Sequence, residues 1–166
     1  MCKIFFENDP LQKQQFSKIW HYKDWSKANK NYSKSDIGID LVAKINGSDK
    51  FCAIQCKCYQ SEHTISKSDI DSFISASSTD DFERLILIDT SSQDIGINAK
   101  KVFNNLDKKY QRIQLNELQE SRIDWLSYLK DEKVVLNKKK ELRDHQIKAV
   151  DAVLSGLNKK DRGKLI

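Results

Sequence analysis

Three polar residues near the middle of the chain have the types and spacing of a site that cleaves phosphodiesters: Asp40, Gln55 and Lys57. Mg²⁺ takes oxygen ligands, so the Asp40 carboxylate, the Gln55 amide oxygen and the backbone carbonyl of Cys56 form a suitable donor set. A divalent cation neutralises charge on a phosphate, and the Lys57 ammonium can orient the attacking water or stabilise the transition state. One interpretation of these residues is therefore metal-dependent hydrolysis, with Mg²⁺ as cofactor and Mn²⁺ as a substitute.

A hairpin brings these residues together. Apolar residues alternate from Ile37 to Ile45, which predicts a strand with one buried face, and Asn46-Gly47 is a strong hairpin signal before a second strand over about 50–59. With a two-residue turn, residue 45 lies opposite residue 48; with a four-residue loop, Asp40 lies opposite Gln55, with Cβ atoms about 5 Å apart. Because sheet faces alternate with period two, both registers put Asp40, Gln55 and Lys57 on one face. The opposite face is expected to hold Ile37, Ile39, Cys52 and Cys56.

A second interpretation of the same spacing involves no chemistry. A strand can expose a polar face to water, where Asp40 and Lys57 would form a surface ion pair that contributes little to stability. Spacing alone leaves both interpretations open.

The rest of the chain predicts helices and strands in alternation, which is typical of a mixed α/β sheet. Asp9-Pro10 is a helix start, because Asp caps the helix and Pro suits its first position. Ser66 and Asp69 have the spacing of a capping box. The predicted elements are a helix from residue 10 with an apolar stripe of Phe16, Ile19 and Trp20, a short strand within 20–25, a helix over 66–78, a buried strand over 85–88, a helix over 98–106, a strand over 112–115, and helices over 123–129 and 147–157.

Composition excludes several classes of protein. No stretch approaches the roughly 20 apolar residues of a membrane span, so we expect no membrane partner. The net charge of +5 lies entirely in residues 130–166, with 11 basic and 6 acidic residues, because residues 1–129 contain 18 of each. The first part therefore offers no compositional argument for a polyanion partner. Cys52, Cys56 and Cys58 lack the CxxC spacing of a zinc site, which favours small core residues in a reducing, cytoplasmic protein.

The central motif resembles a known family. Gly38-Ile39-Asp40 followed by Gln55-Cys56-Lys57 is similar to the G-x-D…Q-x-K signature of Mrr-type nucleases in the PD-(D/E)xK superfamily. Residues 36–43, 53–57 and 65–73 also resemble the nuclease domain of type ISP restriction enzymes. The resemblance implies a restriction-endonuclease-like mixed sheet flanked by helices, with a C-terminal helical extension. It also implies metal binding by Asp40 and Gln55, a catalytic Lys57, and cleavage that leaves a 5′-phosphate and a 3′-hydroxyl.

The resemblance divides the chain into three parts. Residues 1–129 would be an Mrr-like nuclease domain, 130–141 a basic linker, and 142–166 the incomplete start of a superfamily 2 helicase-like ATPase. In that motor the Gln146 position would contact adenine, but no phosphate-binding loop follows here, so ATP is expected only for the full-length protein. The superfamily often carries another acid on its first core helix, for which Glu7 is the candidate.

These features predict a Mg²⁺-dependent DNA endonuclease domain of a restriction-modification protein. Its expected partners are double-stranded DNA and the helicase and methyltransferase domains of the same full-length protein, with an ATP-driven motor bringing it to DNA. The alternatives are a catalytically silent DNA-binding or docking module and a structure-specific, junction-type nuclease.

Overall fold

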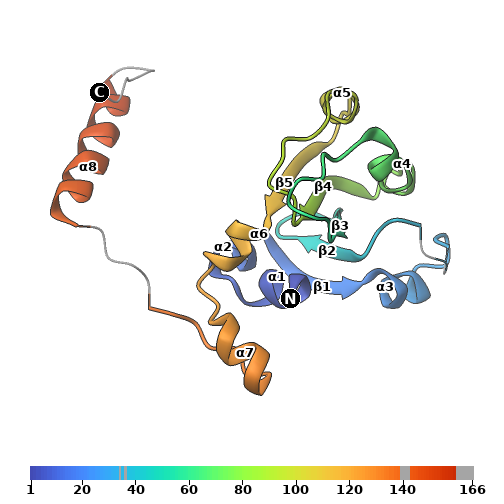
Figure 1. Cartoon of the computed structure of the whole chain (residues 1–166), viewed down its shortest axis with the longest axis horizontal. Helices are drawn as coiled ribbons and strands as arrows, with labels where there is room; N and C mark the ends of the chain where they lie inside the picture. The colour runs from blue at the N-terminus through green and yellow to red at the C-terminus, as the bar shows by residue number, and fades with distance from the viewer. Residues whose placement is uncertain (34, 36, 139–142, 160–166) are drawn as a thin grey trace. The chain divides into compact units, whose positions relative to one another are not determined.

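The computed structural model describes residues 1–33, 35, 37–138 and 143–159 (Figure 1). The chain divides into two compact units, residues 1–136 and 137–166. The second unit contains the amphipathic helix α8, Asp144–Lys159, near the predicted 147–157. The candidate site lies wholly in the first unit.

The first unit is built on one five-stranded sheet in the order β1-β2-β3-β4-β5. Strands β1, β2 and β3 pair antiparallel, whereas β3, β4 and β5 are parallel. The elements are α1 (Cys2–Asn8), α2 (Pro10–Gln15), β1 (Phe16–His21), α3 (Tyr22–Ala28), β2 (Leu41–Ile45), β3 (Phe51–Lys57), α4 (Lys67–Ala76), β4 (Phe82–Asp89), α5 (Ile97–Asn104), β5 (Lys109–Gln114), α6 (Leu115–Gln119) and α7 (Trp125–Asp131).

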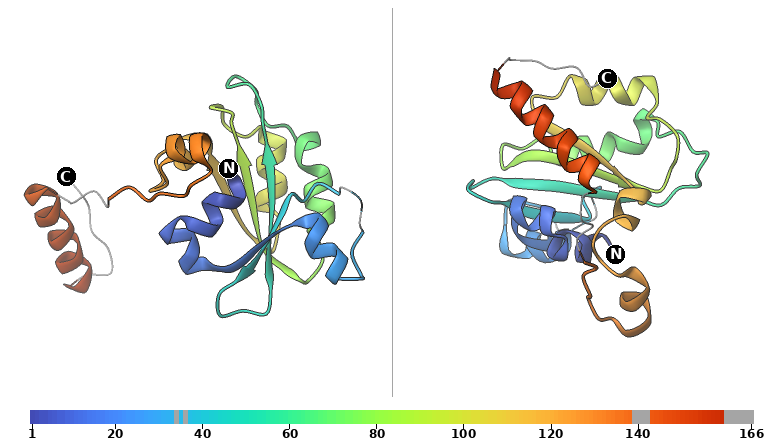
Figure 2. Two further views of the ribbon diagram at one scale, coloured as in Figure 1. Left: turned by 90° about the horizontal axis from the view of Figure 1, so that it is seen from below. Right: turned by 90° about the vertical axis from the view of Figure 1, so that its left-hand side faces the viewer.

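Helices cover both faces of the sheet, as Figure 2 shows. On one face, α1, α6 and α7 pack against alternate residues of the central strands, including Cys52 and Ile54. On the other face, α3, α4 and α5 pack around Ala53 and Leu87. The predicted mixed α/β sheet flanked by helices is therefore confirmed. No helix within the described residues has the length and apolar character needed to cross a membrane.

The N-terminal segment differs from the prediction. Asp9 does cap a helix, since its Oδ1 accepts hydrogen bonds from the N–H groups of Leu11 and Gln12 at 3.0 and 3.3 Å. That helix ends at Gln15, and Phe16–His21 forms β1. A register shift between Phe16 and Lys18 allows residues three apart to be buried on the same side, which imitates helical spacing. The short strand predicted within 20–25 is wrong, because α3 begins at Tyr22.

The hairpin adopts the longer of the two predicted connections. Leu41 lies opposite Ile54 and Lys44 opposite Phe51, so residues 46–49 form a four-residue loop. Regular β structure begins only at Leu41, because Gly38 has a φ of +88° that interrupts the extended chain. Ile37 and Ile39 therefore pack in the same core as Ala53, and their predicted place beside Cys52 is wrong.

Most later elements fall near their predicted positions. The capping box of α4 is present: Asp69 accepts a hydrogen bond from the Ser66 N–H. Helix α6, which the sequence analysis did not anticipate, follows β5 directly. Residues 139–141 of the predicted linker and residues 142 and 160–166 of the predicted motor segment lie outside the described part of the chain.

Candidate active site

Asp40 is fixed by backbone hydrogen bonds to two neighbouring elements. Its N–H donates to the Ile54 carbonyl, and its carbonyl accepts from the Tyr22 N–H, both at 2.9 Å. Its side-chain Oδ2 accepts a hydrogen bond from the Cys56 N–H at 2.7 Å. These contacts continue the β2–β3 pairing beyond Leu41, so Asp40 lies beside Gln55, as the four-residue loop requires.

Gln55 is a buried polar residue, and the oxygen of its side-chain amide, Oε1, accepts no hydrogen bond from any described residue. The residue is 3% exposed. A buried acceptor without a partner typically costs about 1–3 kcal/mol. A ligand that bound to such an atom would remove this cost.

The predicted site residues line a cavity of about 270 Å³, which is called here the Asp40 cavity. Lys57 is half-buried at its wall and forms no ion pair with any described carboxylate. The surface ion pair of the second interpretation is thus absent from the described contacts. The cavity is lined by Ile37, Gly38, Asp40, Gln55, Cys56, Lys57 and Ser72.

Gly38 allows α4 to approach this cavity closely. A Cβ on Gly38 would lie 2.6 Å from Ser72 Oγ and 2.9 Å from the Phe73 N, closer than side-chain carbons normally come. Only glycine readily combines this contact with a φ of +88°. The first residue of the G-x-D motif therefore has a steric role in positioning Asp40 against α4.

The thiol of Cys56 belongs to the opposite side of the sheet. It packs against the core cluster that contains Phe5 and Phe6 of α1. A hydrogen bond with the Cys2 thiol raises the pKa of the Cys56 thiol, and burial and the charge of Asp40 act in the same direction. The same hydrogen bond lowers the pKa of Cys2 to about 7. Cys52 is a core residue as predicted, whereas Cys58 is exposed, so the core role expected for Cys58 is wrong.

A polar cluster supports the segment that follows β3. Tyr59 stacks on His63 with ring centroids 4.0 Å apart, and His63 Nε2 lies 3.1 Å from Asp69 Oδ2. Burial acts to raise the pKa of Asp69, but hydrogen bonds from the Ser66 N–H, the Ser66 hydroxyl, His63 and Tyr59 bring it down to about 2. Asp69 therefore stays ionised and holds this segment against the start of α4.

The end of β4, to which the sequence analysis assigned no role, carries a buried ion pair. Asp89 is fully buried and accepts hydrogen bonds from Arg112 Nε at 2.6 Å and Nη2 at 2.8 Å. The strand register places Asp89 directly beside Lys57. An acidic residue that ends a continuous apolar strand was the signal available in the sequence.

The remaining predicted residues lie elsewhere. Glu7 pairs with Lys3 on α1 and is not among the residues that line the Asp40 cavity. Gln146 belongs to the second unit, where its Oε1 accepts a hydrogen bond from the Arg143 N–H at 2.9 Å and so caps α8. Neither observation tests the roles expected from the resemblance.

The residues around the Asp40 cavity fit a divalent cation with oxygen ligands. They supply a carboxylate at Asp40, the Gln55 Oε1 that has no partner among the described residues, and the backbone carbonyl of Cys56. Among the described residues, no group of three or more His, Cys, Asp and Glu side chains could hold a metal ion. Any ion here would therefore depend on amide and backbone oxygens in addition to one carboxylate.

Comparisons with known proteins agree with this architecture. A family model of Mrr-type catalytic domains, described as restriction endonuclease, matches residues 7–135. The chain therefore belongs to this restriction endonuclease family. The predicted restriction-endonuclease-like fold is confirmed by this match. No curated protein matches the chain.

One solved structure is similar over nearly the whole sequence. It is described as the ATP-dependent Type ISP restriction-modification enzyme LlaBIII bound to DNA, and it matches 99% of this chain at 30% identity and a TM-score of 0.66. The chain spans 10% of the length of that enzyme. The resemblance to Mrr-type nucleases and to type ISP enzymes is thus confirmed.

Two other solved structures show much weaker similarity. The MspJI restriction endonuclease in complex with a 27-mer oligonucleotide matches 51% of this chain and 19% of its own, at 14% identity and a TM-score of 0.39. The protein AF1548, described as of unknown function, matches 59% of this chain and 62% of its own, at 13% identity and the same TM-score. Similarity at this level carries no argument about the site.

Proposed function

We propose that residues 1–136 hydrolyse DNA phosphodiesters in a reaction that depends on Mg²⁺ or Mn²⁺. The observation that carries this proposal is the Asp40 cavity, where a carboxylate, a buried unpartnered amide oxygen and a half-buried lysine line one space. Family membership supports the choice of nuclease chemistry, and the type ISP relative, whose structure is described as bound to DNA, supports DNA as the substrate.

Each residue has a separate task in this proposal. Asp40, Gln55 Oε1 and the Cys56 carbonyl would hold the cation, which supplies positive charge next to the phosphate. Lys57, which pairs with no described carboxylate, keeps its ammonium free to donate a hydrogen bond to water or to the phosphate. Water adds to phosphorus as the P–O3′ bond breaks, which leaves a 5′-phosphate and a 3′-hydroxyl.

The whole protein would deliver this activity through a motor. Because the chain spans only 10% of the type ISP relative, we propose that ATP-driven movement comes from domains beyond this chain. Gln146 would then contact adenine in the full-length protein, in partnership with helicase and methyltransferase domains. The location proposed for that protein is the cytoplasm.

A plasmid-nicking assay tests the proposed reaction. With Mg²⁺ or Mn²⁺, the chain should relax supercoiled DNA, and Asp40→Ala and Lys57→Ala should each lower the rate by about 100-fold or more. Lys101→Ala, at an exposed position on α5, should leave the rate unchanged.

Three results would contradict or redirect the proposal. Nicking that survives both Asp40→Ala and Lys57→Ala would exclude this cavity as the active site. Duplex binding without cleavage at any metal concentration would instead favour the silent docking module. Cleavage confined to branched DNA would favour a junction-type nuclease.

A further inference from the structure

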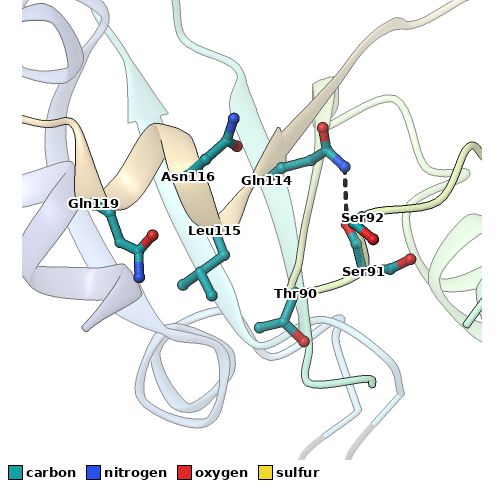
Figure 3. Close-up of a pocket in the computed structure, with 7 residues that line it drawn as sticks. All are labelled: Thr90, Ser91, Ser92, Gln114, Leu115, Asn116 and Gln119. Atoms are coloured by element: carbon teal, nitrogen blue, oxygen red, sulfur yellow. Dashed lines mark hydrogen bonds between the residues drawn. The ribbon is translucent and has the colours of Figure 1, made fainter. Parts of the chain in front are cut away.

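A second polar cavity lies at the same edge of the sheet as the Asp40 cavity. It has a volume of about 350 Å³ and is formed by the segment after β4 and by the start of α6 (Figure 3). The parallel register places Lys57, Asp89 and Gln114 in one row across β3, β4 and β5. Neighbouring strands are roughly 4.8 Å apart, so the backbones of Lys57 and Gln114 are separated by about 10 Å. That distance is about three base-pair rises of 3.4 Å along DNA.

The side chains that line this second cavity, called here the amide cavity, are uncharged. Gln114 Nε2 donates to the Ser91 carbonyl at 2.8 Å, and the Gln114 side chain also belongs to the capping box at the start of α6. Asn116 Oδ1 accepts from the Glu117 N–H at 3.0 Å, so its Nδ2 remains available as a donor. The side chain of the exposed Gln119 forms no hydrogen bond with any described residue, so its amide offers both a donor and an acceptor. The amide cavity therefore offers both donors and acceptors.

This chemistry fits a nucleobase better than a phosphate. Phosphate only accepts hydrogen bonds, and proteins neutralise it mainly with Lys and Arg, which are absent from this lining. A base edge presents donors and acceptors side by side, and Asn and Gln amides can match them in pairs. Leu115, drawn between Gln114 and Gln119 in Figure 3, adds an apolar surface for a thymine methyl group or the face of a base.

We propose that the amide cavity is a subsite for the edge of a DNA base within about three nucleotides of the scissile phosphate. The inference rests on the proposed nuclease function, because that function places the scissile phosphate at the Asp40 cavity. Its consequence is that the nuclease domain itself influences which sequences are cut.

The wall of the amide cavity is already fixed before any ligand binds. Asp89 accepts a hydrogen bond from the Ser91 N–H at 2.9 Å, while Arg112 Nη1 donates to the Gln93 carbonyl at 2.9 Å. The Ser91 hydroxyl also donates to the His63 carbonyl. A prearranged wall loses little conformational freedom on binding, which favours selective contact with one base.

Sequencing the ends produced from DNA of random sequence tests the subsite, because each cut end reports its own register. The chain should show a preference of about fivefold or more for particular bases within about three nucleotides of the cut. The double variant Asn116→Ala/Gln119→Ala should reduce that preference below about twofold, since both amides are removed. Gln111→Ala is the matched control, because this exposed glutamine of β5 does not line the amide cavity. No preference in the unmodified chain, or one that the double variant retains, would overturn the subsite.

A second experiment separates this inference from the nuclease proposal. A photoreactive benzophenone amino acid in place of Gln119 should crosslink to nucleobases of a bound duplex, whereas the same group at Gln111 should not. Base adducts from a chain that never cuts DNA would support the subsite and contradict the proposed function. Adducts confined to sugars, or no adducts, would contradict the subsite even in an active nuclease.

Discussion

Replacing Gln55 with glutamate tests whether its unpartnered oxygen is a metal ligand. Gln55→Glu keeps the shape of the side chain but puts a carboxyl group at a position that is 3% exposed and beside Asp40. Burial and the neighbouring negative charge both raise the pKa of the introduced carboxyl above its ordinary value of about 4.3. A rise of about two units corresponds to a loss of about 3 kcal/mol in the free energy of unfolding when the group is ionised.

The sign of this effect gives a distinct pH dependence. Below about pH 4 the introduced carboxyl is protonated in both folded and unfolded chains, so the variant and the parent should differ little. Stability of the variant should then fall as pH rises toward the raised folded-state pKa, and the full loss should remain above it. At about pH 8 we expect the melting temperature to drop by roughly 6–12 °C without metal, at 2–4 °C per kcal/mol.

A bound cation should reverse most of this loss. Metal at about 100 times its dissociation constant stabilises a folded protein by about 2.7 kcal/mol, which is close to the expected penalty. Differential scanning fluorimetry with and without Mg²⁺ measures both quantities. The variant should show a larger metal-induced rise in melting temperature than the unmodified chain, because it adds a second carboxylate.

Gln12 provides a matched control for burial. It is 8% exposed, and its Oε1 also has no hydrogen-bond partner within the described part of the chain, but it lies on α2 and does not line the Asp40 cavity. Gln12→Glu should therefore lower stability without rescue by metal. Equal responses of the two variants to Mg²⁺, or no response from Gln55→Glu, would refute the assignment of Gln55 as a ligand.

Three further substitutions test the framework around the site. Asp89→Asn should lower the free energy of unfolding in urea by about 3 kcal/mol, because it leaves the Arg112 charge without its buried partner. A loss below about 0.5 kcal/mol would mean that this pair adds no more than a surface contact. The low pKa of Asp69 predicts stability that is present above about pH 4 and lost as pH falls through about 2, by at most about 2 kcal/mol. Asp69→Asn should remove this dependence, and an unchanged acid profile in urea titrations would contradict it. Gly38→Ala should destabilise the chain more than Gly47→Ala, since both glycines have positive φ but only a Cβ at Gly38 meets α4. Equal urea midpoints for the two alanine variants would exclude the steric role of Gly38.

Period-two alternation was sufficient to predict the shared face of the site. Val42 and Ala53 lie on the α4 side, and Asp40 and Gln55 follow them in the same alternation. The four-residue loop then fixed the register that the sequence left open. The assignment of a catalytic role to each residue came from family resemblance, because alternation is the same in an inert surface strand.

Other features depended on tertiary contacts that no local pattern encodes. The register shift between Phe16 and Lys18 gives the buried residues of β1 the spacing of a helix. The sequence pattern therefore predicted a helix where the structure has a strand. The turn at Gly38 moved Ile39 to the other core. The amide cavity combines the end of β4 with α6, which are neighbours only because β4 and β5 pair.

The most direct test of the site is the position of a bound ion. Crystals grown with Mn²⁺ should show an anomalous difference peak bonded to the Asp40 carboxylate, Gln55 Oε1 and the Cys56 carbonyl. A Mn²⁺ peak bonded to other residues, or no peak with Gln55 Oε1 hydrogen-bonded to the protein, would contradict the proposed metal centre.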